Sequence, residues 1–152
     1  MGNPARTYRQ LSAQGISPVG VVMQAYDQIV SALGGAVRAI GDRDIEGKTR
    51  ELNHALALIS HLRRDLDFKA GGEVALVMDR FYAIARTQIL EASALLSTEI
   101  LQQAISQFAS QREAWDQVER ANSTTSRVSD PAAPGAAGRE EHTPMPSARW
   151  SA

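Results

Sequence analysis

Apolar side chains recur at steps of three and four residues through most of this chain, and that period restricts the fold to packed helices. From residue 18 to about 41 the apolar positions form one wide helical face. Ser17 and Pro18 give a start signal, because Ser can cap free N–H groups and Pro at the first helical position loses no hydrogen bond. The same period continues in three later segments, and no stretch shows sustained strand alternation.

Short polar or glycine-rich stretches separate these segments. The sequence "GDRD", residues 41–44, ends the first helix, and a second is predicted over 45–67. Gly71-Gly72 then precede a third helix that reaches Leu95, with Glu73 in its first turn, where a negative charge suits the helix dipole. Ser97 can cap a fourth helix. Because short turns make consecutive helices antiparallel neighbours, we predict an all-α antiparallel four-helix bundle.

Two predicted stripes decide which side chains should face the core. The stripe of the first helix is Val19, Val22, Met23, Tyr26, Ile29, Val30, Leu33, Val37 and Ile40. The stripe of the third helix is Val74, Val77, Met78, Phe81, Ile84, Ala85 and Ile89.

The chain divides into three parts. We predict a short N-terminal helical arm over residues 1–16, a helical bundle domain over 17–120, and a tail over 121–152. The tail is rich in Ser, Ala, Pro and Gly and has few large apolar residues. Such a segment cannot bury enough surface to offset the entropy of ordering it, so we predict that the tail is disordered.

Composition excludes several classes of function. Acidic residues outnumber basic ones by 17 to 16, so no basic surface indicates nucleic-acid binding. With no cysteine, disulfides, zinc fingers and thiol catalysis are excluded. We find no secretory signal and no apolar run long enough to span a membrane, and we expect a cytoplasmic protein.

The motifs that carry chemistry are missing. Gly71-Gly72 follow a helical segment and lack the Lys-Ser/Thr pair of a phosphate-binding P-loop, so a turn between helices explains them better. A di-iron bundle needs two Glu-x-x-His motifs, and the chain has one, Glu51 to His54. His61 lies too far along the helix to share a metal ion with His54. We therefore expect no catalytic residues, no cofactor and no metal.

Some apolar residues lie off the predicted core stripes. Val21 and Ala25 do so in the first helix, Leu58 in the second, and Leu76 and Leu90 in the third. One explanation is that some helices are central in the bundle and apolar nearly all round. The other is a groove that takes an amphipathic helix of a partner. Periodicity alone does not separate the two.

Motifs in a characteristic order connect the chain with a known family. They are Tyr8, "SPVGVVMQAYDQIVSAL" from residue 17, "LNHALALISHLRRDLDFKAGGEVAL" from residue 52, "FY" at 81–82 and "REAW" at 112–115. In this order they resemble the FliS family of flagellar secretion chaperones, over about residues 8–119. Ile16, Gln28, Ala83 and Ile84 depart from the family pattern, and the tail extends past its usual end.

This resemblance implies a function. Members of the family bind the disordered C-terminal segment of flagellin in the cytoplasm, block its polymerisation and assist its delivery to the flagellar type III export apparatus. The contacts that it leads us to expect here are Tyr8, Val21, Val22, Ala25, Tyr26, Asp27, Leu58 and Leu62. It also implies the export gate and a flagellin-binding assembly factor as partners, and a weak homodimer stays open. The alternatives are a bundle that binds a small molecule or metal, and a regulatory or scaffold protein with another helical client.

Overall fold

The computed structural model describes residues 18–128, with side chains up to residue 123. This part of the chain forms four α-helices and no strand: α2 (Pro18–Gly41), α3 (Ile45–Arg64), α4 (Phe68–Leu95) and α5 (Thr98–Val128). The predicted all-α fold is confirmed. The predicted arm over 1–16 and most of the predicted tail lie outside the described residues.

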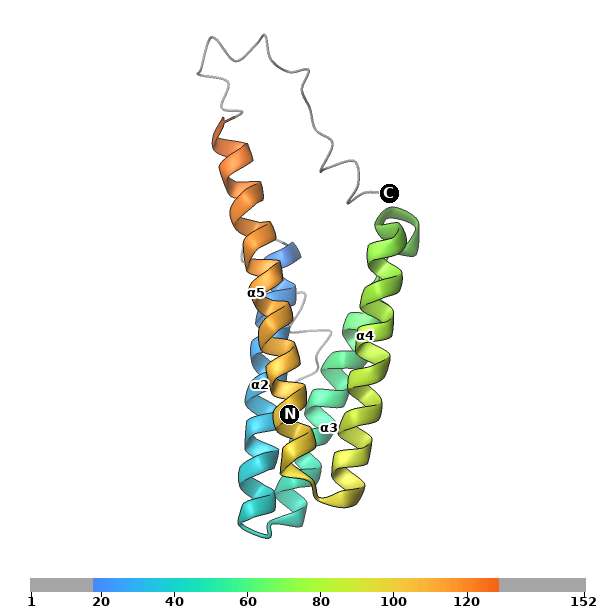
Figure 1. The fold of residues 1–152 in the computed structure, drawn as a ribbon, viewed down its shortest axis with the longest axis vertical. Helices are drawn as coiled ribbons and strands as arrows, with labels where there is room; N and C mark the ends of the chain where they lie inside the picture. The colour runs from blue at the N-terminus through green and yellow to red at the C-terminus, as the bar shows by residue number, and fades with distance from the viewer. Residues whose placement is uncertain (1–17, 129–152) are drawn as a thin grey trace.

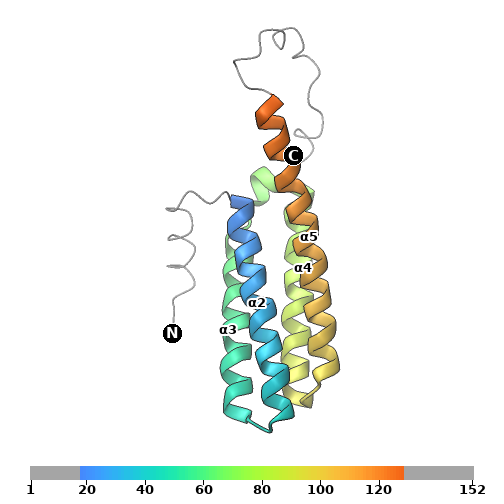
Figure 2. The ribbon, with the colours of Figure 1, turned by 90° about the vertical axis from the view of Figure 1, so that its left-hand side faces the viewer.

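The helices form an antiparallel bundle in which consecutive helices run in opposite directions (Figure 1). Helix α2 packs against α3 and α5, and α4 packs against the same two helices. Helices α2 and α4 therefore occupy opposite corners of the bundle. Turned by 90°, the bundle shows α2 and α3 on one side and α4 and α5 on the other (Figure 2).

Side chains cap the helices where the sequence changes from polar to apolar. The carboxylate of Asp44 accepts a hydrogen bond from the Gly47 amide at 2.9 Å at the start of α3. Asp67 caps α4 in the same way, and the Ser97 hydroxyl accepts from the Ile100 amide at 3.2 Å, which confirms the predicted cap of α5. Each cap satisfies an amide that has no partner inside its helix.

Helix α4 is interrupted at the glycine pair. Gly72 has φ 52° and ψ −126°, a conformation that only glycine adopts without strain. Residues 68–71 already form a helical turn, which Asp67 caps through the amides of Lys69 and Ala70. The regular helix that follows Gly72 therefore begins after the glycines, as predicted, and one additional capped turn, residues 68–71, precedes it.

The off-stripe apolar residues Val21 and Ala25 of α2 belong to the core of the bundle and do not line an open groove. Val21 is 5% exposed and Ala25 is 3% exposed, so both belong to the buried side of the helix. Val22 is only half-buried, although the predicted stripe included it. The prediction that Val21 and Ala25 lie off the core stripe is wrong, because α2 has neighbours on two sides and buries an arc wider than one stripe.

A glycine lets α2 and α3 approach closely. A methyl group added at Gly35 would lie 2.8 Å from the carboxyl carbon of Glu51 on α3. The neighbouring Gly34 has open space by comparison, since the nearest atom would be the Arg38 guanidinium at 3.7 Å. Only one member of the Gly34-Gly35 pair therefore serves the helix contact.

Helix α5 ends later than composition suggested. It continues to Val128, so its last eight residues, 121–128, lie within the predicted tail. Once a helix exists, each added residue forms a hydrogen bond at small entropic cost, so a polar end can extend a stable helix. The boundary at 120 marks the end of the apolar stripe rather than the end of the helix.

Candidate partner-binding surface

An aromatic cluster joins three helices inside the bundle. The ring of Tyr26 on α2 makes an edge-to-face contact with Phe108 on α5, with centroids 5.2 Å apart. Phe81 on α4 contacts Phe108 at 5.0 Å and the ring of Tyr82 at 5.6 Å. Edge-to-face pairs at these distances add to the stabilisation from burial alone. The cluster fixes the position of α4 relative to α2 and α5.

Hydrogen bonds run through the same cluster. The hydroxyls of Tyr26 and Tyr82 lie 2.8 Å apart, and the indole N–H of Trp115 donates to the Tyr26 oxygen at 3.3 Å. Burial raises the pKa of the Tyr26 phenol above its ordinary value, and the hydrogen bonds from Tyr82 and Trp115 oppose that shift. The network joins α2, α4 and α5 within the core, which gives it a structural role.

Asp27, next to Tyr26, faces the surface and pairs with α5. Its carboxylate accepts two hydrogen bonds from the Arg112 guanidinium, at 2.6 and 3.2 Å. The pair raises the pKa of Arg112, so the guanidinium stays charged at all ordinary pH values. Both side chains are more than a third exposed, so the pair adds little stability and mainly aligns α2 with α5.

Helix α4 is tied to α3 by two polar contacts. The guanidinium of Arg63 pairs with Asp79 at 2.9 Å. The ammonium of Lys48, although nearly buried, donates to the backbone carbonyl of Ser93 at 3.3 Å. These contacts leave the opposite side of α4 uncovered by any described helix.

The structure places most of the predicted contact residues in the core. The buried ones are Val21, Ala25, Tyr26, Leu58 and Leu62. Val22 is half-buried and Asp27 is exposed, while Tyr8 lies outside the described residues. Their contact with a client stays a prediction. The five buried side chains have almost no exposed surface in this structure.

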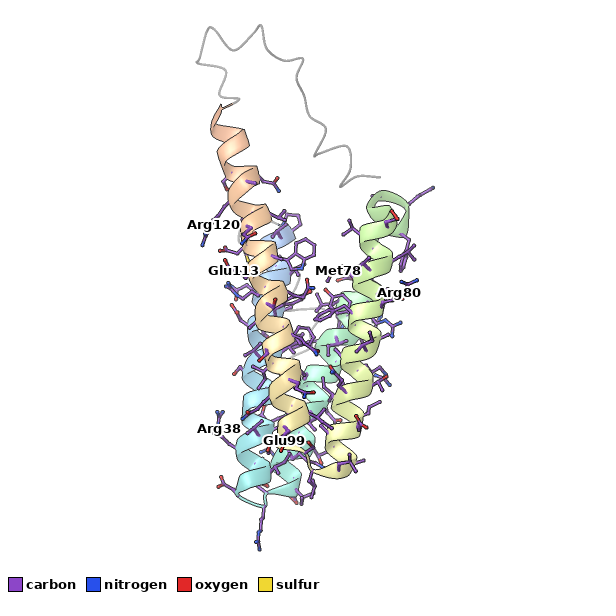
Figure 3. The ribbon with its side chains drawn as sticks, in the orientation of Figure 1. Arg38, Met78, Arg80, Glu99, Glu113 and Arg120 are labelled. Carbon is purple, nitrogen blue, oxygen red and sulfur yellow. The ribbon has the colours of Figure 1, made fainter. Side chains whose placement is uncertain are left out.

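Exposed apolar side chains gather instead on the outer face of α4. They are Leu76 at 54%, Val77 at 59%, Ile84 at 59% and Leu90 at 47% exposed. The labelled Arg80 side chain projects from the same helix away from the bundle (Figure 3). We call these four apolar residues with Ala83 and Arg80 the α4 face. Apolar side chains grouped on one exposed face are typical of a binding surface.

The sequence pattern correctly predicted two of the four exposed apolar residues of the α4 face. Leu76 and Leu90 were predicted to lie off the core stripe, and their exposure confirms it. Val77 and Ile84 were predicted as core residues, which is wrong. The buried arc of α4 is instead centred on Met78, Tyr82, Ala85, Ile89 and Ala92. A usable signal was present, because Arg80 lies between Val77 and Ile84 at helical spacing and indicates a face in contact with water.

Residues 18–128 were searched for two further features, a cluster of metal ligands and a membrane-spanning helix. No group of three or more His, Asp or Glu side chains within this part of the chain is placed to hold a metal ion. His54 is exposed and His61 is half-buried. No helix among residues 18–128 has the length and apolar character needed to cross a membrane.

The fold and the α4 face define a helical-bundle protein with an exposed apolar helix. The family model described as Flagellar protein FliS matches residues 1–122, which includes nearly all of the bundle. The chain therefore belongs to the FliS family, a family of flagellar export chaperones. No curated protein matches the sequence.

Proposed function

We propose that this protein is a cytoplasmic export chaperone that binds the disordered C-terminal segment of flagellin. In this role it prevents premature polymerisation and assists delivery to the flagellar type III export apparatus. Membership of the FliS family supports the role. The observation that carries it is the α4 face, where Leu76, Val77, Ile84 and Leu90 are exposed in the free chain.

The client would lie on the α4 face as an amphipathic helix. A segment that is disordered alone loses entropy when it orders, and burying an apolar face offsets that loss. The aromatic cluster and the Arg63–Asp79 pair hold α4 in place behind this surface. The export gate and a flagellin-binding assembly factor remain predicted partners, as does a contact through Tyr8.

Titration calorimetry tests the function directly. Flagellin from the same organism should bind the protein one to one, with a strongly negative heat-capacity change because apolar area is buried. Flagellin that lacks its C-terminal segment is the matched control and should not bind. Equal binding of the two flagellins would overturn the proposed client segment.

A further inference from the structure

Two arginines border the apolar row of the α4 face. Leu76, Ala83 and Leu90 recur at intervals of seven residues, about two helical turns, so they form one row along α4. Because each residue turns an α-helix by about 100°, Arg80 and Arg86 lie about 60° to either side of Ala83. Both arginines are exposed, and neither forms an ion pair with another described side chain. A segment bound along this row therefore meets a positive charge on each flank.

Negative charges lie beyond the two arginines. Glu73 and Glu91 are exposed, so the unpaired charges along α4 run negative, positive, positive, negative. Asp79, which lies between them in the sequence, pairs with Arg63. A second copy of this face would set like charges opposite one another in either direction, which is unfavourable. The face instead suits an occupant whose charges run positive, negative, negative, positive.

The tail of this chain carries that order of charges. After residue 138 its charged side chains are Arg139, Glu140, Glu141 and Arg149. Successive side chains of an extended chain point to opposite sides, so Glu140 and Glu141 can reach one arginine each across the apolar row. Residues 131–138 are all Pro, Ala or Gly, whose small side chains allow close approach to the row. Met145 and Trp150 supply larger apolar groups after the acidic pair.

The tail also leaves the bundle within reach of this face. Helix α5 ends at Val128, at the same end of the bundle at which α4 begins (Figure 1). Because α4 and α5 are antiparallel and joined by a short turn, Val128 lies about 20 Å along the bundle from the level of Arg80. Residues 129–139 span up to about 36 Å when extended, which covers this distance and the width of a helix.

We propose that residues 139–150 of this chain cover the α4 face in the free protein, with Glu140 and Glu141 paired to Arg80 and Arg86. A contact within one chain has an effective concentration on the order of 1 mM. A segment with an affinity on the order of 1 mM therefore covers the face in about half of the molecules. As a regulator of client access the contact rests on the proposed function, because flagellin has to displace the tail.

Paramagnetic broadening in the full chain, without flagellin, tests the contact. The chain has no cysteine, so Thr143→Cys provides a single site for a nitroxide label close to the acidic pair. Amide signals of residues 76–90 should weaken by about twofold or more, whereas those around Ser31 on α2 should not change. A mixture of isotope-labelled chains with separate spin-labelled chains should show no broadening, because the contact lies within one chain.

Charge reversal tests the pairing. Glu140→Arg with Glu141→Arg should remove the broadening, and this variant changes no residue of the bundle. Arg80→Glu with Arg86→Glu should remove it as well, since the pairs become repulsive. Combining all four changes should restore it, because opposite charges face each other again.

Arg38→Glu with Arg50→Glu is the matched control. Both arginines are exposed and lie on α2 and α3, and Arg38 projects away from the bundle (Figure 3). This variant should keep the broadening at residues 76–90. Wild-type chains without broadening there overturn the proposal, as does broadening that survives the reversals at the paired positions. Broadening in the mixed sample also overturns it and assigns the face to a second chain.

Flagellin titration separates this contact from the proposed function. Without a competing tail, the Glu140→Arg, Glu141→Arg variant should bind flagellin about twofold more tightly than the wild type. Equal affinities overturn the competition. Flagellin that binds a wild-type chain without broadening overturns the tail contact alone. Broadening in a chain that never binds flagellin overturns the proposed function alone.

Discussion

The hydroxyl oxygens of Tyr26 and Tyr82 lie 2.8 Å apart, so one hydrogen bond joins the two helices at opposite corners of the bundle. Both side chains are almost completely buried. A buried hydroxyl needs a partner, because leaving it without one costs about 1–3 kcal/mol. The bond therefore links the position of α4, which carries the exposed apolar face, to the centre of α2.

The first prediction concerns this bond. Tyr26→Phe should lower the free energy of unfolding by about 1–2 kcal/mol, since Tyr82 and Trp115 both lose a partner. Tyr82→Phe should cost less, because Tyr26 keeps its bond from Trp115. In urea denaturation the double variant should lose less stability than the two single variants added together. Strict additivity would show that the two hydroxyls do not interact.

Alkaline pH tests the environment of Tyr26. Burial raises the pKa of this phenol above 10.0, so the folded state holds the proton more tightly than the unfolded state. The resulting stabilisation is complete below pH 10 and is lost as pH rises through the folded pKa. Urea denaturation at about pH 8 and about pH 11 should show the stability advantage of the wild type over Tyr26→Phe shrinking at the higher pH. A constant difference would contradict burial of the phenol.

The two adjacent glycines of α2 should respond differently to the same change. Gly34→Ala should stabilise the protein by about 0.5–1 kcal/mol, because alanine favours the helix and its methyl group has space. Gly35→Ala should gain less or destabilise, since its methyl group would displace the Glu51 carboxyl group. Thermal unfolding of the two variants checks this. Equal gains would mean that α2 and α3 do not approach closely at Gly35.

The α4 face should be separable from stability. Ile84→Glu should change the free energy of unfolding by less than about 0.5 kcal/mol, because the side chain is already exposed. It should weaken flagellin binding by about tenfold or more, since a carboxylate is costly to bury. Calorimetry with Ser31→Glu, which adds the same charge to an exposed position of α2, provides the control. Unchanged flagellin binding in Ile84→Glu would exclude this face as the docking surface.

Val21 offers the opposite case. It is buried, so Val21→Glu should destabilise the bundle by several kcal/mol, by about the cost of burying a charge without a partner. Thermal unfolding followed by circular dichroism checks this. Val21→Glu should lose its helical signal at a lower temperature than the control Val22→Glu, which changes the half-buried neighbour. A stable Val21→Glu variant would show that Val21 lies on the surface of the bundle, as the sequence pattern predicted.

The sequence by itself determined the four helices, their short connections and the cap at Ser97. These features depend on neighbouring residues, because a 3.6-residue period, a capping hydroxyl and a break at Gly72 act within a few positions of the chain. The family followed from short motifs in their order, and its model match confirms it.

Only the tertiary structure decided which face of each helix is buried. The apolar arc of helix α2 is wider than one stripe, so the pattern could not show that Val21 and Ala25 are covered; the two helices packed against α2 decided this. In α4 the apolar arc is wider than the area that α3 and α5 can cover. Tyr82 is therefore buried, whereas Ile84 is exposed. Periodicity gives the width of an apolar face, but its burial depends on where neighbouring helices pack, which residues distant in sequence determine.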